Sequence, residues 1–235
     1  PSELAPWQVI GREALAWTAA GLLFPFGFKR VTKRTQRLAS QQTIVLIHGY
    51  MGNSSNFLPL IGYLRAKNIT AKVLSFNYRS SNGIEKSARD LKEFLRLNVR
   101  GGTIDLVCHS LGGLVARVYL QDLGGARRVN RCITLGTPHK GTYSAYWFTS
   151  KVGHELRPYS EILKRIERSE NQAAKVRFTS IVAGSDNIVL PRVFAANQET
   201  VHVSNLGHIG LLFSPTVFKA IAKRLTTRTS IESLF

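Results

Sequence analysis

The sequence contains little cysteine. Among 235 residues there are two cysteines, Cys108 and Cys132, which are too few for a disulfide framework. Both lie in short apolar runs that we expect to form buried strands, so we predict two reduced cysteines in the core, and the redox compartment stays open. The apolar fraction of 44% and the charged fraction of 20% exclude a chain that is disordered throughout.

Acidic residues are also scarce. Thirty-two Lys and Arg residues against fourteen Asp and Glu residues give a net charge of +18 at pH 7. Such an excess attracts polyanions, and it does not determine the fold. The densest basic cluster lies in Lys29–Arg37, and no nucleic-acid-binding motif with interleaved aromatic side chains surrounds it. We therefore predict no nucleic-acid partner and consider an anionic membrane surface instead; the bland alternative is that the charge only aids solubility.

The chain has no obvious membrane-spanning run in its N-terminal region. Ala14–Phe28 is uncharged over fifteen residues, but a spanning helix needs about twenty, and Gly21, Pro25 and Gly27 interrupt it. A clear signal peptide is also lacking. This stretch is therefore either packed on the domain or placed at a membrane interface with Trp17 in lipid. The chain starts at Pro1, so we expect sequence upstream, and we favour a membrane-associated, periplasmic or secreted location.

A regular alternation of short apolar runs and helical patterns begins at residue 43. The runs are rich in Val, Ile and Leu, as in strands covered on both faces. They are Thr43–His48, Ala71–Phe76, Thr103–Cys108, Arg131–Leu135, Arg177–Ala183 and Thr200–Val203. This order predicts an α/β fold with a mostly parallel central sheet of about six strands flanked by helices. We expect one catalytic domain over residues 43–235 and an N-terminal apolar and basic segment over residues 1–42.

The interval between the runs ending at Leu135 and starting at Arg177 is unusually long for this kind of fold. It contains an aromatic stretch at 143–148 and then a helical stretch of mixed charge. We predict a lid-like insertion over about residues 143–172; the alternative is an ordinary surface helix.

Residues Cys108–Gly113 read C-H-S-L-G-G, after an expected strand and at the start of an expected helix. A strand-to-helix elbow raises a serine hydroxyl at the carboxyl end of the strand and requires small residues two positions before and after that serine. The usual pattern is G-x-S-x-G, and Cys108 replaces its first glycine. We predict that Ser110 is a nucleophile rather than only a helix cap.

A serine nucleophile needs a histidine base oriented by a carboxylate, and in this type of fold the chain order is Ser, acid, His. Only one of the four aspartates, Asp186, follows Ser110 at the end of an expected strand, and Glu199 is the fallback. The other aspartates lie on a solvent-facing helix, in the nucleophile strand and at a helix end: Asp90, Asp105 and Asp122.

Two histidines follow Asp186. His202 lies inside an expected strand, whereas His208 lies in a loop with glycines on each side at 207 and 210. We therefore predict that His208 is the base. His154 is expected to be solvated, and His48 is expected to brace its own loop.

The oxyanion of a tetrahedral intermediate requires two N–H donors. We predict the backbone amide of Leu111 and, from the loop His48–Asn53, that of Tyr50, with Met51 as the near alternative. We predict no metal site, because His139 and His154 lack partners at ligand spacing, and no cofactor, because phosphate-loop and dinucleotide motifs are missing.

Three motifs together resemble the α/β-hydrolase superfamily, in particular the small, minimal-type bacterial triacylglycerol lipases. They are Ile47–Gly52 with Asn56-Phe57, Cys108–Gly113, and Leu206–Leu212. In those lipases the elbow also starts with a small residue other than glycine. Thr137–Thr142 instead resembles the larger lidded lipases. The resemblance covers about residues 43–225 and implies the same roles for Ser110, Asp186, His208, Tyr50 and Leu111.

The resemblance differs from each group in one respect. The minimal lipases have no lid, and the larger ones often bind calcium through paired aspartates, which we do not find here. The expected function is hydrolysis of carboxylic esters of lipids through an acyl-enzyme. The alternatives are an acyltransferase or phospholipase with the same residues, or a non-catalytic protein that binds polyanions or membranes. Acyl-chain preference and oligomeric state are not predicted.

Overall fold

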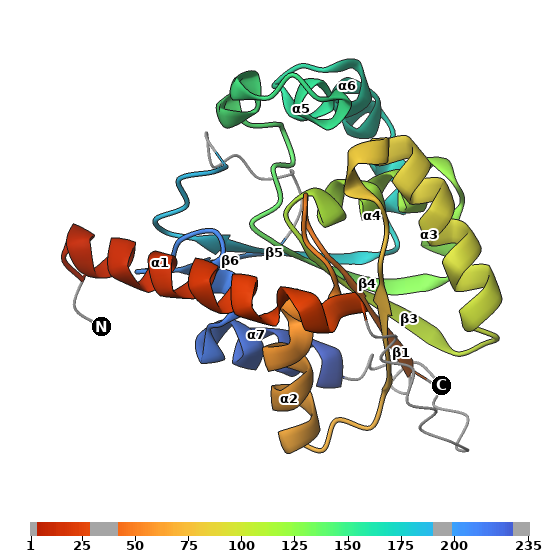
Figure 1. Cartoon of the computed structure of the whole chain (residues 1–235). Coiled ribbons are helices and arrows are strands. Elements are labelled where there is room, and N and C mark those ends of the chain that lie inside the picture. Colours follow the sequence, from red (N-terminus) through yellow and green to blue (C-terminus); the bar gives the residue numbers. More distant parts are fainter. Residues whose placement is uncertain (1–3, 29–41, 190–198, 228–235) are drawn as a thin grey trace.

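The computed structural model of the chain describes residues 4–28, 42–189 and 199–227. Its centre is one six-stranded sheet in the order β2-β1-β3-β4-β5-β6, and every neighbouring pair is parallel (Figure 1). The strands are β1 Gln42–Ile47, β2 Lys72–Phe76, β3 Thr103–His109, β4 Val129–Leu135, β5 Arg177–Ala183 and β6 Glu199–Val203. The predicted α/β fold with a parallel sheet of about six strands is confirmed.

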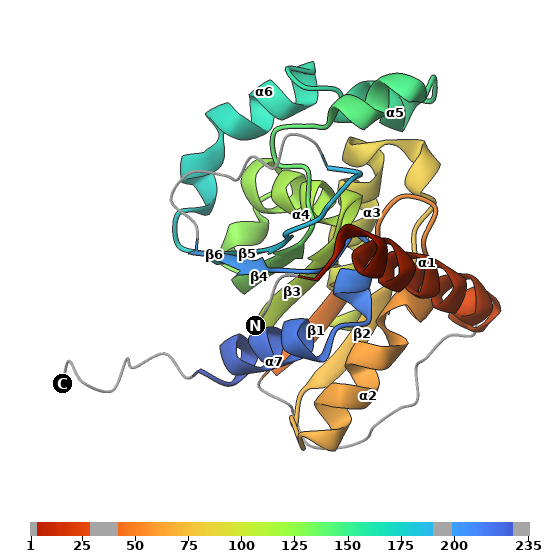
Figure 2. The same ribbon diagram turned by 90° about the vertical axis from the view of Figure 1, so that its left-hand side faces the viewer.

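Helices cover both faces of this sheet. They are α1 Pro6–Leu23, α2 Leu58–Ala66, α3 Ile84–Asn98, α4 Leu111–Asp122, α5 Lys151–Leu156, α6 Glu161–Arg168 and α7 Pro215–Thr226. Successive strand residues point to opposite faces, so Val45 and Ile47 pack with α3 and α4, while Ile44 and Leu46 pack with α2 and α7. Figure 2 shows the sheet between these two helical layers.

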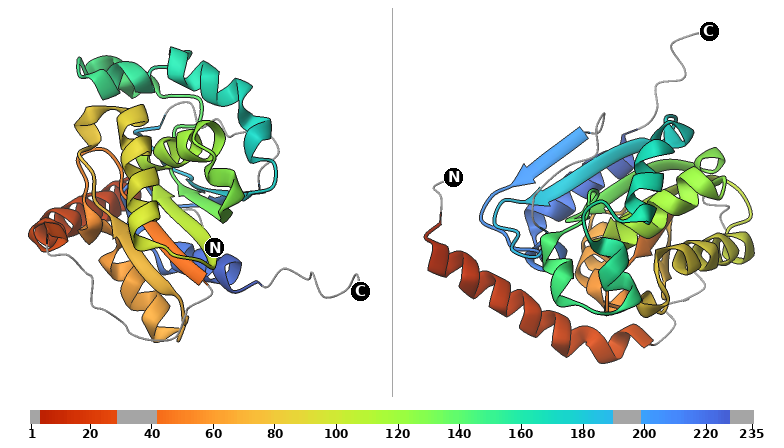
Figure 3. Two further views of the ribbon diagram at one scale, coloured as in Figure 1. Left: turned by 90° about the vertical axis from the view of Figure 1, so that its right-hand side faces the viewer. Right: turned by 90° about the horizontal axis from the view of Figure 1, so that it is seen from above.

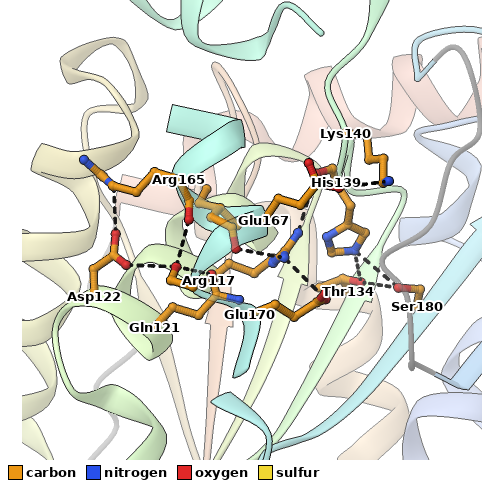
Figure 4. Close-up of polar contacts among 12 residues, drawn as sticks. Arg117, Gln121, Asp122, Thr134, His139, Lys140, Arg165, Glu167, Glu170 and Ser180 are labelled. Carbon is orange, nitrogen blue, oxygen red and sulfur yellow. Dashed lines mark hydrogen bonds and ion pairs between the residues drawn. The ribbon is translucent and has the colours of Figure 1, made fainter. Parts of the chain in front are cut away.

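The long interval between β4 and β5 forms an insertion above the sheet, which begins with the 3₁₀ helix η5 Tyr143–Trp147 and continues through α5 and α6 (Figure 1). Apolar side chains of α6, including Leu163 and Ile166, join the same buried cluster as α3 and α4. Polar contacts add to this anchorage: Arg165 Nε lies 3.0 Å from Asp122 Oδ2 on α4 (Figure 4). The insertion is therefore packed on the domain along α6.

The aromatic end of the insertion is exposed. Tyr143, Tyr146, Trp147 and Phe148 are all exposed, and Trp147 retains 89% of its accessible surface. Phe148 contacts the ring of Tyr50, with ring centroids 6.4 Å apart. The exposed aromatic group thus lies beside the loop that follows β1.

The N-terminal helix α1 runs along the outside of the domain (Figure 3). Only Val9, Glu13 and Ala16 form its buried stripe, and the rest of its surface is mostly apolar but exposed. The Lys29–Arg37 cluster lies outside the described residues. Within the described parts of the chain, no helix has the length and hydropathy needed to cross a membrane.

All strands run in one direction, so the loops after β1, β3, β4, β5 and β6 meet at one edge of the sheet. Helix α4 begins there, pressed against the end of β1. A Cβ atom at Gly112 would lie 2.5 Å from the carbonyl oxygen of Ile47 and 2.7 Å from that of His48. Only glycine permits this approach without a shift of the backbone.

Replacing Gly112 with alanine should lower the free energy of unfolding by roughly 1–3 kcal/mol, because the new methyl group overlaps backbone atoms. Gly62→Ala is the matched control: Gly62 is an exposed position in α2 where a Cβ meets no atom within 4 Å. That substitution should stabilise by about 0.5–1 kcal/mol. Urea unfolding of the three proteins measures both changes; equal stability of Gly112→Ala and wild type would contradict the close approach.

Candidate active site

Ser110 lies at a sharp turn between β3 and α4. Its backbone has φ 52° and ψ −123°, a conformation that L-residues seldom adopt. Three hydrogen bonds fix the turn: the Ser110 amide donates to the Leu135 carbonyl at 2.8 Å, and the Ser110 carbonyl accepts from the Thr137 hydroxyl at 2.9 Å and the Gly113 amide at 3.0 Å. Strain held by surrounding contacts is typical of a nucleophile elbow. Ser110 is partly exposed, whereas Cys108 and His109 are buried.

Asp186 and His208 are in direct contact at the same edge. His208 Nδ1 lies 2.9 Å from Asp186 Oδ2, and both side chains are almost completely buried. A carboxylate accepts hydrogen bonds, so Nδ1 carries the proton and Nε2 is left as the basic nitrogen. The other carboxylate oxygen of Asp186 accepts the amides of Ile188 and Val189, each at 2.9 Å. The structure thus brings together the two side chains that were predicted as acid and base.

Opposing effects act on the pKa of Asp186. Burial alone would raise this pKa, but the hydrogen bond and charge of His208 and the amides of Val189 and Ile188 outweigh burial and lower it. Asp186 is therefore an ionised hydrogen-bond acceptor at neutral pH. Such a group holds an imidazole in one tautomer and stabilises the imidazolium that forms when the ring takes up a proton.

His109 connects the serine turn with the His208 loop, a role that the sequence analysis missed. The two imidazole centroids are 4.8 Å apart, and His109 Nε2 donates to the His208 carbonyl at 3.3 Å. Burial, with a smaller contribution from the His208 charge, lowers the pKa of His109 to about 3. His109 is therefore a neutral spacer, which sets Ser110, the next residue, beside the His208 loop.

The loop after β1 reaches the same place. A Cβ at Gly49 would lie 3.0 Å from Ser110 Cβ, so this loop touches the serine turn. The Met51 amide donates to Ser80 Oγ at 2.9 Å. The Tyr50 amide is therefore the better candidate for the oxyanion donor that this loop supplies. His48 braces the loop: its ring stacks on Tyr78 at 4.4 Å and accepts the Tyr78 amide. Leu111, the other predicted donor, is the first residue of α4.

The remaining acidic candidates lie away from this edge. Glu199 is the first residue of β6, at the amino ends of the strands and so away from the Ser110 turn, and it pairs with Arg224. Asp105 is buried in β3 and pairs with Arg131 at 3.3 Å, while Asp122 binds the insertion through Arg165. Each of these three carboxylates therefore has an ion-pair partner of its own.

The other histidines are also separate from the site. His139 is buried, and its Nε2 lies 3.1 Å from Thr134 Oγ1 and 3.2 Å from Ser180 Oγ (Figure 4). Burial and the nearby Arg117 charge hold the pKa of His139 well below its usual value. His154 is exposed on α5, and His202 is exposed on β6. Among the described residues no group of His, Cys, Asp and Glu side chains is arranged to hold a metal ion.

A parallel sheet with a strand–serine–helix elbow and an Asp–His pair after later strands defines the α/β-hydrolase fold. The solved structures that share it include two bacterial proteins. Lipase BlEst2 from Bacillus licheniformis, in mature form, is 17% identical with a TM-score of 0.65, over 82% of this chain and 95% of that chain. The lin2722 gene product from Listeria innocua is 16% identical with a TM-score of 0.61, over 81% of this chain and 96% of that chain.

Family models match most of the sequence. Residues 97–225 match the model of the PGAP1-like alpha/beta domain, and residues 25–148 match a domain of unknown function, DUF7379. The chain therefore belongs to the PGAP1-like alpha/beta domain family, among the lipase-, esterase- and thioesterase-like α/β hydrolases. The expected membership of the α/β-hydrolase superfamily, with bacterial lipases as structural neighbours, is confirmed.

A curated relative is the lysosomal thioesterase PPT2-B of Xenopus laevis. It is 23% identical over 120 residues, which cover 48% of this chain and 41% of the relative. The chain thus spans about two fifths of the length of that protein.

Buried neutral histidines predict a loss of stability in mild acid. Burial lowers the pKa of His48 to about 4 and that of His109 to about 3, whereas an unfolded histidine titrates at about 6.5. Below pH 6.5 the unfolded chain therefore binds more protons, and stability falls as pH decreases through this window. At pH 5 the expected loss is roughly 2 kcal/mol for each of the two histidines.

Urea unfolding at pH 8, 6 and 5 measures this dependence. His48→Gln should show a shallower dependence than wild type, because one of the groups is removed. Gly62→Ala changes no titratable group and should keep the wild-type slope. If the free energy of unfolding of the wild type stays constant from pH 8 to pH 5, the lowered pKa values of His48 and His109 are contradicted.

Proposed function

We propose that the protein is a serine hydrolase of carboxylic esters, with Ser110 as nucleophile, His208 as base and Asp186 as the acid that orients it. The main support is the buried Asp186–His208 hydrogen bond at the edge of the sheet where the strained Ser110 turn lies. His109 contributes because it joins the Ser110 turn to the His208 loop.

In this mechanism Ser110 Oγ attacks the ester carbonyl carbon while His208 Nε2 takes the hydroxyl proton. The carbonyl oxygen gains negative charge and accepts hydrogen bonds from the Leu111 and Tyr50 amides. The C–O bond to the alcohol then breaks, His208 returns the proton to the departing alkoxide, and an acyl-serine remains. Water attacks the acyl-serine with the same proton transfers, releasing the acid and restoring Ser110.

The exposed apolar side chains favour lipid acyl esters as substrates. Met51, next to the proposed oxyanion donor, is 74% exposed, and Phe148, directly after η5, contacts Tyr50 of the same loop. Water-exposed apolar groups of this size near a reaction centre favour contact with acyl chains. The structural neighbour named as a lipase supports this substrate class.

Thioester hydrolysis is a second candidate, because the curated relative is named a thioesterase. The same residues would act on a thioester, with a thiolate as leaving group. Paired oxygen esters and thioesters of one acyl chain would separate the two: a higher kcat/KM on the thioester favours this candidate. An added alcohol acceptor would reveal acyl transfer as an ester product.

Ser110→Ala should abolish hydrolysis of p-nitrophenyl esters, with a loss of about 10³-fold or more in kcat, and Asp186→Asn should lower kcat by about 10³–10⁴-fold. Asp90→Asn is the matched control, since Asp90 is on the surface of α3 and pairs with Lys86. An acyl series from acetyl to oleoyl tests the lipid preference through kcat/KM. Equal rates for wild type and Ser110→Ala would end the esterase proposal.

We also propose that the protein works at anionic lipid surfaces. The outer face of α1 exposes Trp7, Ile10, Leu15, Trp17 and Leu22 to solvent. This apolar helix face occurs in a chain of net charge +18, which complements anionic headgroups.

Co-sedimentation with vesicles tests this surface. Vesicles of phosphatidylglycerol and phosphatidylcholine should bind more protein than phosphatidylcholine alone, and binding should weaken as salt rises, because salt screens the attraction. The double variant Trp7→Gln, Trp17→Gln should bind less than wild type. Leu97→Gln, at an exposed position of α3, is the control and should bind like wild type. Identical partitioning at low and high salt would reject the electrostatic contribution.

A further inference from the structure

Glu13, on α1, has an unusual environment for an acidic side chain. Only 8% of its surface is exposed, and it belongs to the short buried stripe of a helix that is otherwise mostly exposed. Its Oε1 accepts the Ile209 amide at 2.7 Å, and its Oε2 accepts the Gly210 amide at 2.9 Å. These amides belong to the two residues that directly follow His208. One carboxylate therefore holds the backbone on which the proposed base is mounted.

The glycines around His208 are explained by this contact. A Cβ at Gly207 would lie 2.4 Å from Glu13 Cδ, and a Cβ at Gly210 would lie 3.2 Å from Glu13 Oε2. In the structure these glycines make room for the Glu13 carboxylate, so the loop fits closely around it.

The first part of α1 lies over the loops that carry Asp186 and His208 and contacts them at a few points. A cavity of about 690 Å³ lies between this part of the helix and the loops that carry Asp186 and His208, and Ser185, Asn187 and Gly207 line it. Glu13 lies at the border of this cavity and reaches the loop beyond it. A second link is the Leu4 amide, which donates to Asn205 Oδ1 at 3.0 Å.

The other end of the N-terminal segment is held on the opposite side of the site. The carbonyls of the 3₁₀ helix η1, Phe24–Phe28, bind the last residue of the proposed oxyanion loop and the residue that follows it. Phe24 O accepts from Asn53 Nδ2 at 2.9 Å, and Gly27 O accepts from Ser54 Oγ at 2.7 Å. The helix is therefore fixed at both ends, which gives Glu13 a defined position from which to hold the His208 loop.

We propose that Glu13 is a positioning residue for the catalytic base: by binding the Ile209 and Gly210 amides, it sets the place of His208 relative to Ser110. This inference rests on the proposed function. A shift of about 1 Å in a reacting group can lower a rate by about 10²-fold. Loss of Glu13 should therefore slow the attack by Ser110 more than it weakens the binding of the reacting ligand.

Covalent labelling of Ser110 by an alkyl fluorophosphonate tests the proposal in the full chain, because labelling requires an activated serine but no particular natural substrate. Glu13→Gln keeps the shape of the side chain and one acceptor oxygen, so we expect the labelling rate at saturation to fall about tenfold with little change in half-saturating concentration. Glu13→Ala should fall further. Val9→Ala removes apolar packing from the same stripe of α1 but leaves the Glu13 carboxylate and its two amide hydrogen bonds in place, and should label at the wild-type rate.

Two further measurements accompany the labelling: the thermal midpoint of each protein and the hydrogen exchange of the peptide that contains Ile209 and Gly210. In Glu13→Gln we expect this peptide to exchange faster while the rest of the domain stays protected. This result can be measured even if Glu13→Ala does not fold. The positioning role is overturned if the wild type is labelled and Glu13→Gln is labelled equally fast. It is also overturned if Glu13→Gln is slowed no more than Val9→Ala. A wild type in which Ser110 is never labelled overturns the proposed function instead. Labelling without ester turnover would reject the ester substrate alone and leave the Glu13 test intact.

Discussion

The hydrogen bond between Asp186 and His208 is the interaction on which the site depends, and it exists because six parallel strands end at one edge. Both side chains are buried, and a buried carboxylate or imidazole without a hydrogen-bond partner is strongly destabilising. The Asp186 carboxylate is satisfied by two backbone amides and one imidazole. His109 Nε2 donates to the His208 carbonyl, and burial keeps the ring of His109 neutral. The edge of the sheet therefore holds its polar groups through a few buried partners, most of which are backbone amides and carbonyls.

The shortage of acidic residues has a structural side. Several of the fourteen acidic residues occupy buried positions with fixed partners: Asp105 pairs with Arg131, Asp186 with His208, and Glu13 with two loop amides. Carboxylates used in this way neutralise little of the surface. Most of the other acidic residues that the structure describes lie at the surface in ion pairs with Lys or Arg, such as Asp90 with Lys86 and Glu93 with Arg96.

Local patterns determined most of what the sequence could predict. The six strands follow from continuous apolar runs, and the Ser110 turn follows from small residues around one serine; both are properties of a few neighbouring residues. The choice of Asp186 and His208 needed one further rule, the chain order Ser, acid, His of this type of fold. Helix α2 contains Pro59 and Gly62, and its proline lies in the first turn, where a helix tolerates it. The roles of His109 and Ser80 depend on contacts with distant loops, and such contacts leave no periodic signal.

The contact between Glu13 and Ile209 joins residues 196 positions apart, in a segment outside the strand–helix alternation, so no local pattern reveals it. Its consequence concerns the whole N-terminal segment. The same helix that binds the His208 loop through Glu13 exposes an apolar face, and its end binds the loop after Tyr50. If binding to a lipid surface stabilises α1 in this docked position by some free energy, thermodynamic linkage is reciprocal. Docking of α1 on the ordered site loops then strengthens lipid binding by that same free energy. Under the proposed contact of α1 with lipid, surface binding would therefore be coupled to the geometry around Ser110.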